Sequence, residues 1–539
     1  MIHADSAGNW FWRSLAFLAA AIVIFPILII LVQWGTIGVG EQEIWQHLFD
    51  TKLDRLATNT LILIVGVGLG VTVLGVSLAW LTTICEFPGR RFFEWALMLP
   101  LAIPGYVMAF VFLGIMNFAG PVQTAVRSQF GRDAWFPDVQ GAAGVIVILS
   151  LVLYPYVYML ARSAFLNQGR KLMDAGRLLG LNRRQAFFRV AIPVARPAIV
   201  AGLALALMET LADFGAVSVF NYDTFTTAIY TAWNGLFNLT VAAQLASLLL
   251  LFVGVTLVLE KQSRDKARYT QEGSTNYLNS YQLKGLNALA TSGLCALVLL
   301  LAFLVPLSQL LLWMFEAGFG DLDERYLGFL GHTLSLGFIA GAVTVVIALV
   351  LAFVKRLPAS PTMQRWTDLS VRLATLGYAL PGSVLAVGIM LGFTFIDSSL
   401  GTALGASVVA LLVAYCCRFL AVAFAPVDAG LEQVRPSVID AARSLGAGPG
   451  RLLRQIIIPL LKPGLITAFT IVLVDVMKEM PATLIMRPFG WETLAVRIYN
   501  MTSEGQWERA ALPAVTLIVI GLIPVYLLIR SARHNARGS

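Results

Sequence analysis

The sequence predicts an all-α polytopic membrane protein of about twelve transmembrane helices, arranged as two parallel six-helix repeats. Three observations predict this fold. The 539 residues are 58% apolar and only 13% charged, apolar runs of membrane-spanning length recur along the chain, and the second half repeats landmarks of the first. Soluble domains are about 45–50% apolar and about 25% charged. The composition therefore excludes a soluble enzyme and an intrinsically disordered chain.

The apolar runs are each long enough to cross a bilayer, which takes about 20 helical residues. Lipid offers backbone polar groups no partner, so each run is expected to be a helix; a β-barrel would show short alternating segments instead. The predicted spans are 14–34, 58–83, 95–117, 141–161, 197–220, 239–259, 290–315, 333–354, 372–395, 405–424, 463–485 and 511–530.

Lys and Arg are distributed unevenly between the predicted loops. With the N-terminus in the cytoplasm, most of the 38 Lys and Arg residues fall in cytoplasmic loops and tails. This asymmetry obeys the positive-inside rule. We therefore expect a multi-pass protein with both termini in the cytoplasm, and we attribute the net charge of +8 to topology rather than to nucleic-acid binding.

Two predicted cytoplasmic loops repeat each other at a constant offset of 266 residues, the distance from Asp174 to Asp440. An offset that covers an even number of spans makes the repeats parallel rather than inverted. The repeated residues are Asp174, Ala175, Gly180, Ile192 and Pro193 in the first loop, and Asp440, Ala441, Gly446, Ile458 and Pro459 in the second.

Each of these loops is predicted to form a helix–turn–helix elbow, which we name the first elbow (170–196) and the second elbow (436–462). Gly180 and Gly446 can adopt the left-handed conformation that ends a helix. Asn182 can cap the next helix. Pro193 and Pro197 are expected to end that helix before the fifth span. An Arg-rich elbow that keeps exposed apolar residues is typical of a docking surface for another protein.

The repeats divide the chain into five predicted regions. The regions are 1–57 (N-terminal tail, first span and external loop), 58–260 (first repeat), 261–331 (linker, seventh span and external loop), 332–530 (second repeat) and 531–539 (C-terminal tail).

Five ionisable residues lie inside the predicted fifth and eleventh spans: Glu209, Asp213, Asp475, Lys478 and Glu479. Such groups cost about 2.5–3.5 kcal/mol each, so each needs a role. On a continuous helix, residues four apart share a face, which would join Glu209 to Asp213 and Asp475 to Glu479. Lys478 can pair with Asp475. We hypothesise that these faces line a translocation path for a hard cation. The alternative is a structural role in holding helices together.

The rest of the sequence contains no motif for metal binding, catalysis or nucleotide binding. The four His and four Cys residues make no ligand spacing, so no metal site is assigned, and no Ser/His/Asp arrangement points to a membrane enzyme. The phosphate-binding G-x-x-x-x-G-K-[ST] loop is also missing. We therefore expect no catalytic residue and no cofactor bound by this chain.

The repeated motif, Asp-Ala-(Ala/Gly)-x-x-x-Gly followed after eleven residues by Ile-Pro, resembles the EAA coupling loop of permease subunits in binding-protein-dependent ABC importers. Asp174 and Asp440 stand where that family has Glu. The resemblance covers nearly all of residues 59–527 and implies the type I ABC importer permease fold. It also implies a bacterial inner-membrane location, two copies of an ATPase subunit that dock on the elbows and use the ATP, and a periplasmic substrate-binding protein.

Segments 209–216, 478–484, 490–497 and 502–511 are similar to signatures of the fused, two-domain ferric-iron permeases. The resemblance therefore implies ferric iron as the cargo. A polyamine, thiamine, a phosphonate and sulfate remain alternative cargoes, and a secondary transporter with twelve spans and no ATPase is the alternative mechanism.

Overall fold

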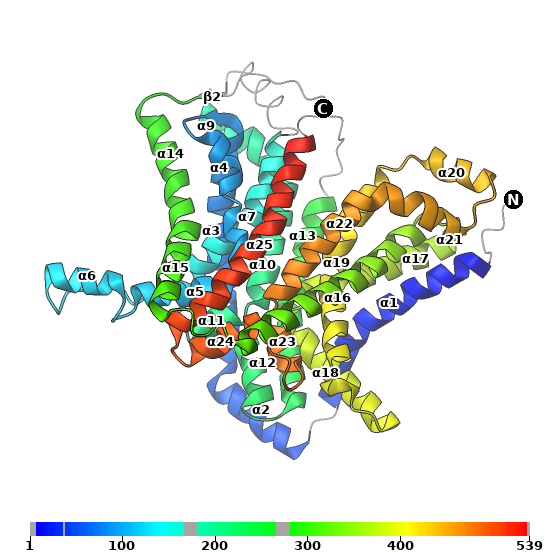
Figure 1. Ribbon diagram of the computed structural model, residues 1–539, viewed down its shortest axis with the longest axis horizontal. Coiled ribbons are helices and arrows are strands. Elements are labelled where there is room, and N and C mark those ends of the chain that lie inside the picture. The colour runs from blue at the N-terminus through cyan, green and yellow to red at the C-terminus, as the bar shows by residue number, and fades with distance from the viewer. Residues whose placement is uncertain (1–6, 36–37, 167–180, 266–280, 536–539) are drawn as a thin grey trace. The chain divides into compact units, whose positions relative to one another are not determined.

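A computed structural model describes residues 7–35, 38–166, 181–265 and 281–535. Within these ranges, 12 helices are long and apolar enough to cross a membrane, which confirms the predicted number. The chain folds into helices almost throughout (Figure 1). Two short strands, β1 (Cys85–Glu86) and β2 (Tyr281–Gln282), pair in parallel.

One compact unit combines Met1–Gln46, Ile229–Ser247 and Leu322–Arg497. Its centre is three long helices, α16, α19 and α22, that pack against one another, and α1 packs along α16, α17 and α18. The segments are α1 (Ala7–Val32), η1 (Gln33–Gly35), α16 (Glu324–Val354), α17 (Pro361–Ala374), η6 (Thr375–Ala379), α18 (Gly382–Leu400), η7 (Leu404–Ala406), α19 (Val408–Glu432), α20 (Pro436–Ser444), α21 (Pro449–Leu452), η8 (Leu453–Ile457), α22 (Ile458–Lys478) and α23 (Pro481–Met486).

The other compact unit combines His47–Ala228, Leu248–Asp321 and Ile498–Ser539. Its centre is formed by α3, α7 and α10, and α15 packs against α25 and α5. The segments are α3 (Leu53–Ile84), α4 (Arg90–Ala96), η2 (Leu99–Ala102), α5 (Gly105–Met116), α6 (Pro121–Phe130), α7 (Ala142–Ala164), α9 (Arg183–Ala186), η4 (Phe187–Ala191), α10 (Ile192–Ala212), α11 (Gly215–Val219), α14 (Leu286–Leu299), η5 (Leu300–Leu304), α15 (Val305–Ala317) and α25 (Trp507–Asn535).

The two units have equivalent centres. Helices α3, α7 and α10 are the second, fourth and fifth of the twelve spans, and α16, α19 and α22 are the eighth, tenth and eleventh. The first span packs in the unit centred on the second repeat, because α1 contacts α16–α18, and the seventh span packs in the unit centred on the first repeat, because α15 contacts α5. Each repeat is thus one continuous stretch of sequence, whereas each compact unit combines three separate stretches. Four further helices contribute residues to both units: α2 (Val39–Thr51), α12 (Phe225–Asn234), α13 (Leu239–Asp265) and α24 (Leu494–Ser503).

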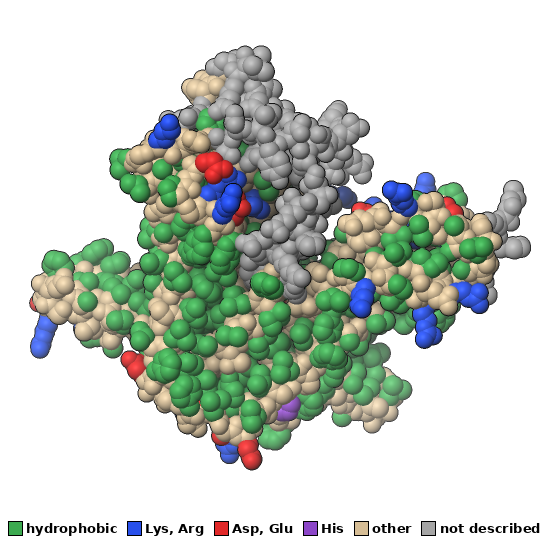
Figure 2. Space-filling model, turned by 45° about the horizontal axis from the view of Figure 1, so that its top comes forward, with side chains coloured by type: hydrophobic (Ala, Val, Ile, Leu, Met, Phe, Trp, Pro, Cys, Tyr) green, Lys and Arg blue, Asp and Glu red, His purple; other side chains and the backbone are tan. Residues whose placement is uncertain are grey.

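Helix α3 separates a lipid-facing stripe from a packing face. Its exposed stripe consists of Leu61, Val65, Leu69 and Val73, spaced four apart. On another face, a Cβ on Gly70 would overlap the Ser150 side chain of α7, so the helices approach more closely than a larger residue would allow. Hydrophobic side chains are spread widely over the face drawn in Figure 2, as expected of a surface that meets lipid.

The third and ninth spans are broken, which the predicted spans 95–117 and 372–395 did not anticipate. The third span is divided into α4, η2 and α5, and the ninth into α17, η6 and α18. Pro104 and Pro381 stand at the breaks, and the residues before them, Ile103 and Leu380, are extended. The cause is local, since a proline biases the preceding residue away from helical geometry. Gly105 and Gly382 then begin the helices that follow.

Candidate coupling elbows and intramembrane charges

The second elbow begins with α20, an amphipathic helix at the surface of its unit. Ile439 is buried against the unit. Asp440 is exposed, and its carboxylate lies 3.6 Å from Arg443. The exposed apolar side chains of the helix and its C-terminal end are Val438, Ala441 and Leu445.

Gly446 ends α20 in the left-handed conformation, with φ of 81°, as predicted. Its N–H donates to the Arg443 oxygen over 2.9 Å, and the N–H of Ala447 donates to the Ala442 oxygen over 3.0 Å. These two bonds form a Schellman motif, which satisfies the last carbonyls of a helix and turns the chain. The turn leads directly into the next helix of the elbow.

From Pro449 to Lys478 the chain is one continuous helical stretch, made of α21, the π-helical turn η8 and α22. Ile458 and Pro459, the end of the predicted motif, are exposed at the start of α22. The second elbow is therefore joined without interruption to the eleventh span.

In the first elbow, Asp174, Ala175 and Gly180 lie outside the described residues. The described part confirms the predicted cap: Asn182 Oδ1 accepts from the Gln185 N–H over 2.9 Å, and Gln185 Oε1 accepts from the Asn182 N–H over 3.1 Å. Helices α9, η4 and α10 then follow at the same 266-residue offset as α21, η8 and α22.

Pro193 and Pro197 do not end the helix, so that prediction was wrong. Ile192 begins α10 directly after η4, Pro193 occupies its second position, and Pro197 lies inside it. The Ile192 N–H bonds to the Phe187 oxygen, five residues back, which marks the wide π-helical turn. A proline lacks an N–H and clashes with the carbonyl four residues before it. The wider turn relieves that conflict, and η8 and η5 likewise precede Pro459 and Pro306.

The fifth and eleventh spans end earlier than predicted. Asp213 follows the last residue of α10 with ψ of 126°, and Glu479 follows the last residue of α22 with ψ of 113°. Both are extended. The predicted helical faces that join Asp213 to Glu209 and Glu479 to Asp475 stay a prediction, because an extended ψ turns the chain after these residues and does not turn their own side chains. Each acidic residue lies at a break between a long helix and a short one.

Glu479 is buried at the second break. Its Oε1 accepts from the Ala482 N–H of α23 over 3.1 Å, and its Oε2 lies 3.3 Å from Nε of Arg418 in α19. Arg418 was not among the predicted site residues, although its position as a basic residue within the predicted span 405–424 was a signal that could have found it. Its partner lies 61 residues further along the chain (418 to 479), in a different span.

Asp213 is half-buried at the first break. Its Oδ1 accepts from the Val217 N–H of α11 over 3.1 Å, and its backbone oxygen accepts from the Thr226 hydroxyl over 2.7 Å. A Cβ on Gly105 would lie 3.2 Å from Oδ2. The two breaks therefore have the same arrangement. In each, the carboxylate accepts a hydrogen bond from a backbone N–H of the short helix that follows. Asp213 also lies beside Gly105 of α5, and Glu479 lies beside Gly382 of α18.

Glu209, Asp475 and Lys478 are half-buried on α10 and α22. The pairing of Lys478 with Asp475 stays a prediction. Among the described residues, no group of three or more His, Cys, Asp or Glu is placed to hold a metal ion. Cys85, Cys295, Cys416 and Cys417 form no disulfide within the described residues, and Cys416 is the one of the four that is not fully buried.

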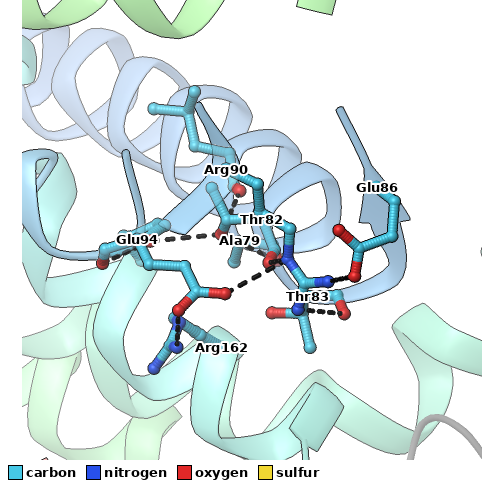
Figure 3. Close-up of polar contacts among 9 residues, drawn as sticks. Ala79, Thr82, Thr83, Glu86, Arg90, Glu94 and Arg162 are labelled. Atoms are coloured by element: carbon cyan, nitrogen blue, oxygen red, sulfur yellow. Dashed lines mark hydrogen bonds and ion pairs between the residues drawn. The ribbon is translucent and has the colours of Figure 1, made fainter. Parts of the chain in front are cut away.

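An ion-pair network joins three helices next to the first elbow (Figure 3). Glu94 lies between two cations, 3.1 Å from Nε of Arg90 and 3.3 Å from Nη2 of Arg162. Arg90 also pairs with Glu86 and donates to the Thr82 oxygen at the end of α3. The network fixes the ends of α3, α4 and α7, and α7 is the helix that precedes the first elbow.

Comparisons with known proteins agree with this duplicated architecture. The Fe(3+)-transport system permease protein FbpB 2 of Haemophilus influenzae is 27% identical over 96% of this chain and 98% of its own length. The ferric transport system permease protein FbpB of Actinobacillus pleuropneumoniae is 23% identical over 94% of this chain and 76% of its own. The sulfate transport system permease protein CysW of Escherichia coli is 29% identical over 39% of this chain and 71% of its own.

The family described as "Binding-protein-dependent transport system inner membrane component" matches residues 72–259 and again residues 345–536. Each match includes one elbow and one long helix that leads from it into the membrane. The chain therefore belongs to this family of inner-membrane transport components, and it carries the family's unit twice in one polypeptide.

Proposed function

We propose that this chain is the membrane-spanning subunit of an ATP-driven importer for ferric iron. The observation that carries the proposal is the similarity to a ferric-iron permease over 96% of this chain and 98% of that relative. A match of this extent includes both repeats and both helix breaks. The cargo is thus inferred from an architecture shared along the whole chain rather than from one motif.

Two copies of an ATPase subunit dock on the two elbows in this proposal, and they hydrolyse the ATP. The exposed apolar face of α20, formed by Val438, Ala441 and Leu445, supports the second docking site. Asp440 and Arg443 flank this face and supply polar contacts at its edge. An apolar helix face bordered by charge is typical of a helix that fits a protein groove.

A periplasmic binding protein delivers the iron to the opposite side of the membrane. The segments proposed to receive it are 118–140, 221–238 and 486–510. This arrangement places both termini and both elbows in the cytoplasm, in accord with the distribution of Lys and Arg in the sequence. The Asp213 carboxylate, at the first helix break, is the proposed contact for the cation on its way between the two sides.

The continuous helix from Pro449 to Lys478 supplies a mechanical route from the ATPase to the membrane. Movement of the second elbow on ATP binding displaces this helix, and with it the break at Glu479. The first elbow continues into α10 and the break at Asp213 in the same way. ATP and the loaded binding protein would thus bias the helices between outward-open and inward-open states.

Sulfate is the alternative cargo that a specific observation favours, because a sulfate permease is 29% identical over 39% of this chain. That match covers about one repeat. An anion is also a poorer partner for carboxylates than a hard cation is. Ferric iron is therefore preferred over sulfate and over the other cargoes that the sequence left open.

The test is purification from the native membrane in detergent, followed by uptake measurements. We expect an ATP-binding subunit to co-purify at two copies per chain, and the reconstituted complex with its binding protein to take up radioactive ferric iron only with ATP. Uptake of labelled sulfate or polyamine in place of iron would identify that compound as the cargo and contradict the assignment of ferric iron. A chain that purifies alone and transports under a proton gradient would contradict the importer itself.

A further inference from the structure

Arg418 and Glu479 form a buried ion pair within one compact unit. Their side chains are 8% and 5% exposed, and Nε of Arg418 lies 3.3 Å from Oε2 of Glu479. Arg418 belongs to α19, and Glu479 occupies the break between α22 and α23. The pair therefore connects the tenth span to the point where the eleventh span ends.

The N-terminus of a third helix, α18, lies against the ion pair. A Cβ on Gly382, the first residue of α18, would overlap Oε1 of Glu479 and lie 2.5 Å from Nη1 of Arg418. Only a glycine lets the backbone come this close. The partial positive charge of the α18 N-terminus then adds to that of α23, whose Ala482 N–H already donates to Oε1.

A second polar link runs beside the ion pair. The Thr483 hydroxyl donates to the backbone oxygen of Glu479 over 2.6 Å, and the Tyr415 hydroxyl of α19 lies 2.6 Å from the Thr483 hydroxyl. The break in the eleventh span is thus bound to α19 through a side chain and through the backbone. Glu479 directs its carboxylate into these protein contacts.

In the described part of the first repeat, α7 carries no cation at the position equivalent to Arg418. Asp213 and Gly105 reproduce the carboxylate and the glycine, but α7, the equivalent of α19, contains one basic residue, Arg162, at its far end. Val152 stands 266 residues before Arg418. The cation is therefore a feature of the second repeat, where it neutralises the carboxylate.

We propose that Arg418 is a positioning residue: it holds Glu479 so that α18, α19 and the α22–α23 break move as one body, and Glu479 does not coordinate the cargo. Because α22 continues from the second elbow, this body would carry the movement of the elbow to the broken ninth span. The proposal rests on the transport function proposed above. It replaces our hypothesis that Glu479 lines the translocation path.

The test compares Arg418→Met, Glu479→Met and the double variant in the full complex with its ATPase and binding protein. Breaking a buried pair leaves one uncompensated charge, whereas replacing both partners by apolar residues is often tolerated. We expect each single variant to lower the maximal rate of iron uptake about tenfold or more, and the double variant to return to within about threefold of wild type. The KM for the loaded binding protein should stay unchanged throughout.

A double variant that assembles but transports as poorly as Glu479→Met would overturn the proposal, because a cargo ligand cannot be restored by removing its partner. Failure of the double variant to assemble would overturn it as well. Arg418→Lys keeps the positive charge but lacks the planar guanidinium group. We expect this variant to retain more iron uptake than Arg418→Met. A rise in KM in any of these variants would favour contact with the cargo.

Lys355→Met is the matched control, since it opens a less buried ion pair with Asp428 in the same unit, 32% and 18% exposed. We expect it to change uptake less than about twofold. Wild-type complex that takes up no iron would contradict the proposed function instead. Normal wild-type uptake with no rescue in the double variant would contradict the positioning role alone.

Discussion

Arg443 donates a hydrogen bond from Nη2 to the backbone oxygen of Arg356 over 2.9 Å, and this bond fastens α20 to the residues that follow α16. The other end of α20 is set by the turn at Gly446. The exposed apolar face of α20 is therefore held in one orientation at two points. A change at either point should disturb docking on this face without disturbing the membrane spans.

Replacing Gly446 by Val should weaken binding of the ATPase subunit. Gly446 has φ of 81°, a conformation that costs a residue with a Cβ about 1–2 kcal/mol. Nothing lies within 4 Å of a Cβ at this position, so the effect comes from the backbone and not from a clash. We expect co-purification of the ATPase to fall roughly tenfold, measured by quantitative pull-down at limiting ATPase.

Gly448→Val is the matched control for Gly446→Val. Gly448 has φ of −69° and ψ of 168°, which any residue adopts, and a Cβ there is equally free of neighbours. We expect this variant to bind the ATPase like wild type. Equal binding by both variants would show that the left-handed turn does not orient the elbow.

Glu94→Gln should destabilise the junction before the first elbow. The substitution removes the charge that pairs with both Arg90 and Arg162, although the Glu94 side chain is 26% exposed and solvent screens part of the interaction. We expect a loss of about 1 kcal/mol, seen as a lower midpoint of thermal unfolding in detergent. Glu86→Gln, at a carboxylate 45% exposed, should lower the midpoint less. The reverse order of the two midpoints would contradict the bridging role of Glu94.

Gly70→Ala should loosen the contact between α3 and α7. The added methyl group would overlap the Ser150 side chain, and overpacking of this kind costs about 1–3 kcal/mol. Gly68→Ala tests the same change two residues earlier, where a Cβ meets Leu203 and Leu207 at an ordinary 3.5 Å. The thermal midpoint should fall for Gly70→Ala alone. A similar fall for both would mean that helix propensity or lipid contact, and not close packing, explains the effect.

The features that sequence analysis predicted correctly depend on local patterns. Hydropathy predicts the twelve spans because a helix is the structure that lipid permits to an apolar segment of this kind. The left-handed Gly446 and the capping Asn182 are likewise defined by residues within a few positions of each other. The repeat itself is visible as a constant offset between two stretches of sequence.

The features that sequence analysis missed depend on tertiary contacts or on breaks inside apolar runs. Helix α10 ends before Asp213 although hydropathy continues to residue 220, so the predicted fifth span is broken where one helix was expected. Arg418 meets Glu479 from another span, and no local pattern relates them. The π-helical turn before Pro193 allows a continuous helix where a proline rule predicted an end.

Asp213→Asn should separate the charge of the first break from its structural role. The Asn side chain keeps an oxygen that can accept from the Val217 N–H, which Asp213 Oδ1 does at 3.1 Å, but it carries no charge. If the carboxylate serves a cationic cargo, iron uptake should fall about tenfold while ATPase binding and the thermal midpoint stay unchanged.

Thr226→Val is the structural control, because it removes the hydroxyl that donates to the Asp213 backbone oxygen and leaves the carboxylate in place. It should lower the thermal midpoint more than it lowers uptake. Full uptake by Asp213→Asn would mean that Asp213 only holds α11. Asp213 is the better of the two break carboxylates for this test, since Glu479 already has Arg418 as a cationic partner.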